Sequence, residues 1–217
     1  MTVNWRKIRE DISNTSDKYL LAVSGGVDSM FMLDFFANSK LDLAVVHYNH
    51  KMRKTSDNEQ YLVEEICLNR GIPFFCNSNT DLDKSSDEQE ARNSRWAFVE
   101  SIAKENGFEH IVTAHHADDQ IENVFIRLMR GDPHDSLIML TKNTKNGFVR
   151  YKPFLDVPKQ AFYDECKKKN IRYIEDESNK DLRYDRNYIR NVIIPAFNQR
   201  TNIKTAIMTG INKGKVK

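Results

Sequence analysis

The sequence is poor in the residues and runs that mark several classes of protein. Its three cysteines, Cys67, Cys76 and Cys166, are widely spaced and form no C-x-x-C pair. An odd, scattered set is atypical of a disulfide framework, a structural zinc site or a dithiol redox centre, and favours a reduced, cytoplasmic protein. No apolar run approaches the ~20 residues that a membrane helix needs. The charged N-terminus contains no signal-peptide core.

Two common nucleotide-binding signatures are also absent: the Walker A loop with its lysine and the dinucleotide motif G-x-G-x-x-G. Between an apolar strand expected over residues 19–23 and a helix expected from Val27, the chain has a glycine-containing loop instead. Glycines allow a sharp turn and close approach of a ligand to the backbone, and a helix N-terminus attracts anions. We therefore predict a phosphate site, although an ordinary strand-to-helix turn stays an alternative. Its residues are Ser24, Gly25, Gly26, Val27, Asp28 and Ser29.

The net charge of +2 conceals an uneven distribution. Residues 1–140 contain 15 Lys and Arg against 23 Asp and Glu, whereas residues 141–217 contain 18 against 8. We divide the chain into a nucleotide-binding core (1–140), a basic part of the same domain (141–197) and a basic tail (198–217) whose last residues we leave without assigned structure. A basic third favours a polyanion partner, although solubility charge on exposed helices gives the same composition.

Strand and helix patterns alternate along the chain. This alternation predicts an α/β domain with a parallel, Rossmann-like sheet, followed by a small helical, basic extension. Ligands of such folds bind beyond the carboxyl ends of the strands, so we expect the polar residues that follow the strands to form one composite site. Residues 131–147 are expected to be loop, and a helix over 187–197 is expected to break near Pro195. Strands are expected at 19–23, 41–48, 72–76 and 109–114, with helices at 55–69, 86–106, 117–130 and from Pro158 to about Asn170.

Basic residues follow the second strand and lie on the long helix. His50 and Arg53 could contact the phosphates or the base edge of a nucleotide. Arg92 and Arg95 are three residues apart, so they share a helix face, and guanidinium forks suit a triphosphate or a carboxylate. The alternative is a solvated basic face paired with neighbouring glutamates.

Two acids, Asp119 and Glu122, are three apart at a helix start, so both carboxylates can face one ligand. They could hold Mg²⁺ through water or neutralise the ammonium of a cationic substrate. The alternative is that carboxylates are favoured in any first helical turn. The neighbouring histidines lack the H-x-x-x-H or H-E-x-x-H spacing of a zinc site.

Arginines alternate with tyrosines in the basic part, at Arg183, Arg186 and Arg190 against Tyr184 and Tyr188. Cations for phosphates and aromatic rings for stacking are typical of RNA recognition. A charged helix with buried tyrosines is the alternative.

Taken in order, these segments resemble the tRNA(Ile)-lysidine synthases of the PP-loop ATP pyrophosphatase superfamily, over about residues 18–197. The resemblance implies an adenine nucleotide alpha hydrolase-like fold. Beside the loop, the segments that carry it are Val46-His-Tyr-Asn-His-Lys-Met-Arg53, Glu90-Ala-Arg-Asn-Ser-Arg95, Ala114-His-His-Ala-Asp-Asp-Gln-Ile-Glu122, Lys152-Pro-Phe-Leu155 and Tyr184-Asp-Arg-Asn-Tyr-Ile-Arg190.

The resemblance also implies a reaction. ATP adenylates the C2 oxygen of the wobble cytidine in an isoleucine tRNA with a CAU anticodon, and free L-lysine then displaces AMP to leave lysidine. The implied ATP ligands are the loop with His50 and Arg53, and the implied Mg²⁺ ligands are Asp28 and Asp119. Asp119 and Glu122 would engage lysine. Asp28, Asp119, Arg92 and Arg95 would serve catalysis, and which arginine meets ATP or lysine stays open. The residues implied to face the tRNA are Arg183, Arg186, Asn187 and Arg190.

This chain departs from the family pattern in three places. Pro133 and Ser136 stand in a loop that usually has further glycines, and Lys152 replaces an arginine. We also expect a short form without the usual C-terminal domains. Two alternatives stay open: another PP-loop adenylating enzyme that modifies tRNA, such as a thiolase, although paired cysteines are missing, and a non-catalytic RNA-binding remnant. The oligomeric state is open, a homodimer included.

Overall fold

The computed structural model describes residues 3–13, 17–49, 51, 56–78, 88–133, 137–175 and 181–214. The chain divides into two compact units. The first unit contains residues 1–114, 142–153 and 160–175, and the second contains residues 115–141, 154–159 and 176–217. The division at residues 140 and 197 that charge suggested stays a prediction.

Six strands among the described residues of the first unit form one sheet, in the order β3-β2-β1-β4-β6-β5. All neighbours are parallel except β5 and β6. The predicted α/β fold with a mostly parallel, Rossmann-like sheet is therefore confirmed. The strands are β1 (Lys18–Ala22), β2 (Asp42–Asn49), β3 (Phe74–Ser78), β4 (His110–Val112), β5 (Lys142–Lys145) and β6 (Phe148–Tyr151).

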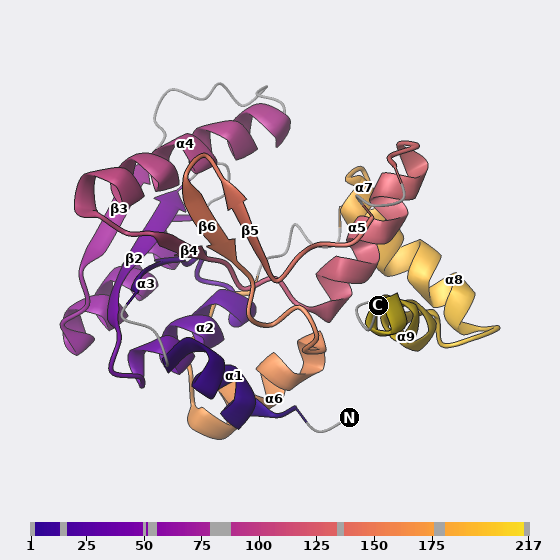
Figure 1. Ribbon diagram of the computed structural model, residues 1–217, viewed down its shortest axis with the longest axis horizontal. Helices are drawn as coiled ribbons and strands as arrows, with labels where there is room; N and C mark the ends of the chain where they lie inside the picture. The colour runs from indigo at the N-terminus through magenta and orange to yellow at the C-terminus, as the bar shows by residue number, and fades with distance from the viewer. Residues whose placement is uncertain are drawn as a thin grey trace. The chain divides into compact units, whose positions relative to one another are not determined.

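Helices cover both faces of this sheet (Figure 1). Because parallel strands are joined by right-handed crossovers, α2 and α3 lie on one face and α4, which returns past β1 to β4, lies on the other. On the α4 side, Val99 and Ala103 pack against Leu20, Ala44 and Ile111. The helices are α1 (Trp5–Ser13), α2 (Val27–Ala37), α3 (Ser56–Arg70), α4 (Glu88–Asn106) and α6 (Lys159–Lys169).

The order in which the strands are added to the sheet reverses between β1 and β4. The chain leaves β1 toward β2 and later returns to β4 on the other side, where Leu21 is in register with Val112. A crevice at the carboxyl ends of the strands at such a switch point is the usual ligand site of an open α/β sheet. The loop that begins at Ser24 follows β1 at this point.

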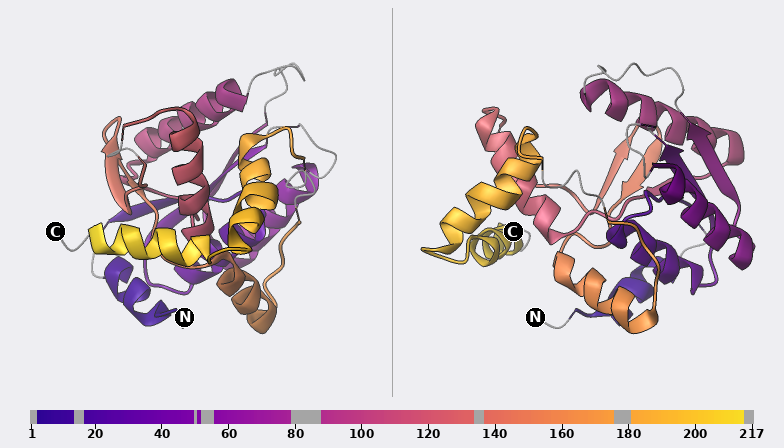
Figure 2. Two further views of the ribbon diagram at one scale, coloured as in Figure 1. Left: turned by 90° about the vertical axis from the view of Figure 1, so that its right-hand side faces the viewer. Right: turned by 180° about the vertical axis from the view of Figure 1, so that it is seen from behind.

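The second unit contains helices packed around isoleucines. Ile121, Ile189 and Ile194 form its buried cluster, and α9 contacts both α5 and α8 (Figure 2). The tail, whose last residues we left without assigned structure, forms helix α9 as far as Gly214, and Ile211 is buried. The helices are α5 (Ala117–Met129), α7 (Asp185–Tyr188), the π-helical segment η3 (Ile189–Ile193), α8 (Ile194–Asn198) and α9 (Ile203–Gly214).

Two local features refine the expectations. Strand β5 lies in residues 131–147, which we expected to be loop: Asn146 (φ 53°) and Gly147 (φ 85°) form the positive-φ turn of a hairpin with β6. The helix expected to break near Pro195 instead continues without interruption from Asp185 to Asn198, and the π-helical segment Ile189–Ile193 precedes the proline, which has no N–H to donate to the preceding turn. Within the part of the chain that the structure describes, no helix is long and apolar enough to cross a membrane.

Phe31 is expected to be a large contributor to the stability of the first unit. Its side chain is 1% exposed and its ring packs on Trp5 (centroids 4.8 Å apart) and Phe162 (5.2 Å). Phe31→Ala should lower the free energy of unfolding by about 3–5 kcal/mol, because it leaves a cavity. The control Leu68→Ala, at a residue 80% exposed, should stay within about 0.5 kcal/mol. Urea denaturation measures both, and equal losses would contradict the packing described.

Candidate functional site

Hydrogen bonds of two serines hold the loop after β1 in its conformation. Ser29 Oγ donates to the Gly26 carbonyl (3.0 Å) and accepts from the Ser24 N–H (3.1 Å), and the two hydroxyl oxygens are 3.1 Å apart. Helix α2 begins directly after Gly26, and no side chain among the described residues caps it. The first-turn N–H groups of a helix have no partner within the helix. They are therefore suited to bind an anion.

Gly25 is the residue that the loop conformation requires. Its φ is +93°, and a Cβ at this position would lie 3.0 Å from Glu59 Cβ. Its carbonyl accepts a hydrogen bond from the Ile174 N–H (3.0 Å). Gly26 has an ordinary φ, and a Cβ there would meet only Ser24 Oγ at 3.7 Å. The second glycine thus leaves room for a ligand beside the backbone, whereas the first is needed by the fold.

His47 supports the loop from β2. Its Nδ1 lies 2.9 Å from the Val23 carbonyl, and burial lowers the pKa of the imidazole. The ring is therefore neutral, with Nδ1 donating and Nε2 left as an acceptor. Our sequence-based choice fell on His50 and Arg53, which lie outside the described residues. His47 belongs to the Val46–Arg53 segment that the sequence singled out, but only His50 and Arg53 of that segment were assigned to ATP.

Asp28 lies in the first turn of α2, near Tyr163 of α6. Burial, with the charges of Glu175 and Asp28, raises the pKa of the Tyr163 phenol to about 12. The phenol stays neutral at physiological pH, and its hydroxyl is hydrogen-bonded to the Glu175 side chain. The Asp28 carboxylate supplies oxygen ligands of the kind that Mg²⁺ prefers.

Cations gather where β6 ends and α4 begins. Arg92 and Arg95 are exposed residues of α4. Burial, together with the charges of Arg150 and Arg92, lowers the pKa of Lys152, whose Nζ donates to Asn143 Oδ1 (2.9 Å). Arg150 pairs with Glu100 and lies over the Trp96 ring at 3.8 Å. The structure thus brings Arg92 together with Lys152, which suits an anionic ligand.

In the second unit, Asp119 caps the start of α5. Its Oδ2 accepts from the His116 N–H (3.0 Å), while His116 Nδ1 accepts from the Asp119 N–H (3.4 Å). Burial by itself would raise the pKa of Asp119, but His116, His115 and Arg186 outweigh burial and hold this pKa below its ordinary value. Asp119 therefore stays ionised.

Glu122 is buried against two arginines of the same unit. Its side chain is 0% exposed; Arg190 donates to it through Nε (2.6 Å) and Nη2 (3.0 Å), and Arg186 Nε lies 3.3 Å away. Burial, with the nearby charge of Asp119, raises the pKa of Glu122 in spite of both arginines. Residues that we assigned to an amino-acid substrate and to RNA are thus in direct contact.

Arg183 and Asn187, the other two residues that we expected to face RNA, both contact Asp181. The Arg183 side chain is 86% exposed and pairs with the Asp181 carboxylate, while Asn187 donates to the Asp181 carbonyl (2.9 Å). Tyr184 and Tyr188 are exposed, contrary to the alternative of buried tyrosines. An outward arginine between exposed rings is suited to a nucleic acid.

One group of possible metal ligands lies elsewhere. In the described part of the chain, Asp17, Glu109 and His110 come close together at the starts of β1 and β4. The loop follows the opposite ends of these strands. This group therefore belongs to another part of the first unit.

Gly25→Ala is expected to destabilise the protein more than Gly107→Ala. Both glycines have positive φ, and alanine there costs about 1–2 kcal/mol. Only the Gly25 substitution also forces a methyl group against Glu59, which adds about 1–3 kcal/mol. Urea denaturation of both variants tests this, and equal losses would show that the contact with Glu59 is not restrictive.

Glu122→Gln should change how stability depends on pH. Because the folded-state pKa of Glu122 lies above the ordinary value of 4.5, its carboxyl favours folding most below pH 4.5. That contribution is lost as pH rises through the folded-state pKa. The free energy of unfolding of wild type minus variant should therefore fall between acidic and neutral pH. Glu64→Gln, at an exposed residue of α3, is the control, and a difference that grows with pH would contradict the assignment.

Comparison with known proteins places this geometry in a family. A family model described as PP-loop domain matches residues 2–197. The chain is 36% identical over 202 residues to the bifunctional protein TilS/HprT of Listeria monocytogenes serotype 4b, covering 88% of this chain and 31% of that protein. It is 36% identical over 188 residues to the tRNA(Ile)-lysidine synthase of Actinobacillus pleuropneumoniae serotype 3, covering 86% and 44%. The chain thus spans less than half the length of these curated relatives.

Solved structures share the fold at low sequence identity. The U34-tRNA thiolase NcsA from Methanococcus maripaludis matches with a TM-score of 0.77 and 16% identity, over 96% of this chain and 76% of that one. The NH3-dependent NAD synthetase from Campylobacter jejuni matches with a TM-score of 0.53 and 11% identity, over 96% and 93%. With the loop, the sheet order and the family match in agreement, the chain belongs to the PP-loop domain family.

Proposed function

We propose that this chain is an ATP-dependent ligase that makes lysidine in tRNA. It adenylates the C2 oxygen of the wobble cytidine of an isoleucine tRNA with a CAU anticodon. The amine of free L-lysine then displaces AMP. The observation that carries the proposal is the 36% identity, over 86% of this chain, to a curated tRNA(Ile)-lysidine synthase.

The loop residues act on the nucleotide in this proposal. The N–H groups at the start of α2 and the hydroxyl of Ser24 hold the phosphates of ATP, with His50 and Arg53 as further ligands. Donors fixed in advance at the departing pyrophosphate stabilise its developing charge without reorganisation. Asp28 would hold Mg²⁺, which supplies further positive charge for the phosphates. Its carboxylate, in the first turn of α2, offers the oxygen ligands that this ion prefers.

The two acids of α5 take different roles because their surroundings differ. Asp119, held ionised, anchors the α-ammonium of lysine. Glu122 is 0% exposed and bonded to Arg190 through both carboxylate oxygens, so it acts through Arg190, whose Nη2 lies 4.0 Å from Asp119 Oδ1. Arg190 and Arg186 hold the Glu122 carboxylate in place. In the first unit, Arg92 or Arg95 meets a phosphate of ATP.

The basic segment recognises the anticodon loop in this proposal. Arg183 is exposed for phosphate contact, and Tyr184 and Tyr188 are exposed for stacking on unpaired bases. Asn187 and Arg190 connect this segment to Asp181 and Glu122 respectively. RNA binding and lysine binding are therefore expected to influence each other through the Glu122–Arg190 pair.

A second candidate, tRNA thiolation, is favoured by the fold similarity to a U34-tRNA thiolase. That protein carries a [4Fe-4S] cluster. Here burial raises the pKa of Cys67 to about 12 and of Cys166 to about 11, so neither is a reactive thiolate. Among the described residues, no cysteine belongs to a group of possible metal ligands. Lysine ligation is therefore the better-supported reaction.

The direct test is incubation of the purified protein with CAU-anticodon tRNA transcripts, ATP, Mg²⁺ and labelled lysine. We expect label in the tRNA and one AMP released for each lysine incorporated. Absence of incorporation into every CAU-anticodon tRNA would overturn the proposal. Incorporation of sulfur in a parallel reaction with a sulfur donor would favour the thiolase alternative.

Two variants should separate the two half-reactions. Asp28→Ala should abolish tRNA-dependent release of pyrophosphate and leave tRNA affinity largely intact. Asp119→Asn should retain pyrophosphate release but raise the KM for lysine about 10–150-fold, the loss expected for a charged hydrogen bond. Asp132→Asn, in the same unit but paired with Arg127, is the matched control. Equal effects of Asp119→Asn and Asp132→Asn on this KM would contradict the lysine assignment.

A further inference from the structure

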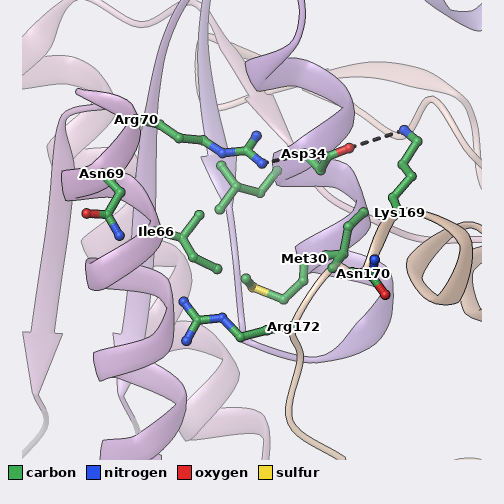
Figure 3. Close-up of a pocket in the computed structure, with 10 residues that line it drawn as sticks. Met30, Asp34, Ile66, Asn69, Arg70, Lys169, Asn170 and Arg172 are labelled. Carbon is green, nitrogen blue, oxygen red and sulfur yellow. Dashed lines mark hydrogen bonds and ion pairs between the residues drawn. The ribbon is translucent and has the colours of Figure 1, made fainter.

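A pocket of about 250 Å³ lies in the first unit, between α2, the end of α3 and the end of α6 (Figure 3). Its apolar wall comes from Met30, Leu33, Ile66 and Ile171. None of these residues is among those assigned to ATP, lysine or tRNA above. The pocket is smaller than the ~300–1,000 Å³ that drug-sized ligands fill, so its ligand is a small molecule.

A buried carboxylate organises the polar side of the pocket. Asp34 is 10% exposed, and it accepts from Arg70 (2.8 Å), Lys169 (3.2 Å) and Asn38 (3.1 Å). Burial would raise the pKa of Asp34, but Arg70 and Lys169 outweigh burial and hold it below its ordinary value. Asp34 is therefore ionised and already bonded, and it holds two cations in place at the pocket (Figure 3).

Those cations retain donors for a further ligand. A guanidinium carries five N–H donors and an ammonium three. Arg70 and Lys169 each use one donor on Asp34, so most of their N–H groups do not bond to that carboxylate. Arg172, 58% exposed and paired with Glu65, adds a third cation to the lining. Arg70, Lys169 and Arg172 carry three positive charges, against two negative charges on Asp34 and Glu65. An anion is therefore the ligand that the pocket favours.

We propose that this pocket binds a small organic phosphate, with its phosphoryl oxygens among Arg70, Lys169 and Arg172 and its carbon skeleton on the apolar wall. Three cations from two helix ends and a loop suit a group with three acceptor oxygens better than a carboxylate, which one fork satisfies. A competing explanation is that the cations serve only to tie α3 and α6 to α2 and to complement the helix C-termini. Binding distinguishes the two explanations.

The pocket is connected to the loop on two sides. Helix α2 begins with the loop and continues into the pocket through Met30 and Asp34. The chain that supplies Arg172 continues to Ile174, whose N–H holds the Gly25 carbonyl (3.0 Å). A ligand in the pocket is therefore expected to alter nucleotide affinity, and the nucleotide to alter ligand affinity by the same factor. Only this coupling rests on the proposed function.

Isothermal titration calorimetry of the full chain with glycerol 3-phosphate tests the proposal. We expect saturable binding that Arg172→Ala weakens about tenfold or more, as for a charge-assisted contact. Arg6→Ala removes a comparable surface arginine paired with Glu10 and should leave binding unchanged. Arg172 is exposed and outside the Asp34 cluster, so its substitution should leave thermal unfolding unchanged, which serves as the folding check.

A second variant identifies the site that is being filled. Gly26→Ala introduces a methyl group at the loop without a close contact, so it should weaken binding of ATP but spare binding of glycerol 3-phosphate. Loss of glycerol 3-phosphate binding in Gly26→Ala with retention in Arg172→Ala would place the anion at the loop and overturn the proposal. Absence of saturable binding at millimolar concentrations would also overturn it. Either result leaves the lysine incorporation assay as an independent test of the proposed function.

Discussion

The conformation of the first unit's loop depends on a position where a side chain does not fit. Gly25 has a φ of +93°, its Cα faces Glu59 of α3, and its carbonyl is held by Ile174 after α6. Three segments far apart in the sequence thus meet at one residue. Helix α2 begins at Val27, two residues after Gly25. The direction of its first N–H groups therefore follows from how Gly25 is held. The orientation of the loop's N–H groups is therefore a consequence of how β1, α3 and the chain after α6 pack.

In the second unit, the balance between burial and neighbouring charges determines the protonation of the two acids of α5. Burial of a carboxylate is unfavourable unless cations and N–H groups compensate it. Asp119 is compensated fully enough to stay ionised, whereas Glu122 is compensated by arginines only in part. Two acids one helical turn apart therefore have different proton affinities.

Much of the first unit could be predicted from the sequence, since its strands are apolar runs bounded by turn residues. The strand expected at 41–48 forms as Asp42–Asn49, and the helix expected at 55–69 forms as Ser56–Arg70. Strand β5 was missed because Lys142–Lys145 is a polar edge strand without an apolar pattern. Its signal was the Asn146-Gly147 pair, a strong hairpin marker that we had assigned to a loop.

Side-chain partners were harder to predict than elements. The candidate residues Glu122 and Arg190 were both chosen from the sequence, but their pairing joins positions 68 apart and depends on the helix packing of the second unit. Asp34 and Lys169 are 135 residues apart, and neither was assigned a role from the sequence. Spacing within one helix indicates a shared face, whereas pairing across the fold requires the tertiary structure.

The most direct measurement of the central claim is hydrogen–deuterium exchange of the full chain with and without a non-hydrolysable ATP analogue. If the loop binds the phosphates, peptides that contain Gly25 to Met30 and the Ile174 amide should exchange more slowly with the analogue. The peptide that contains Gly107, another positive-φ glycine of the same unit, should be unchanged. Unchanged exchange at Gly25 to Met30 under saturating analogue would contradict the claim that this loop is the nucleotide site.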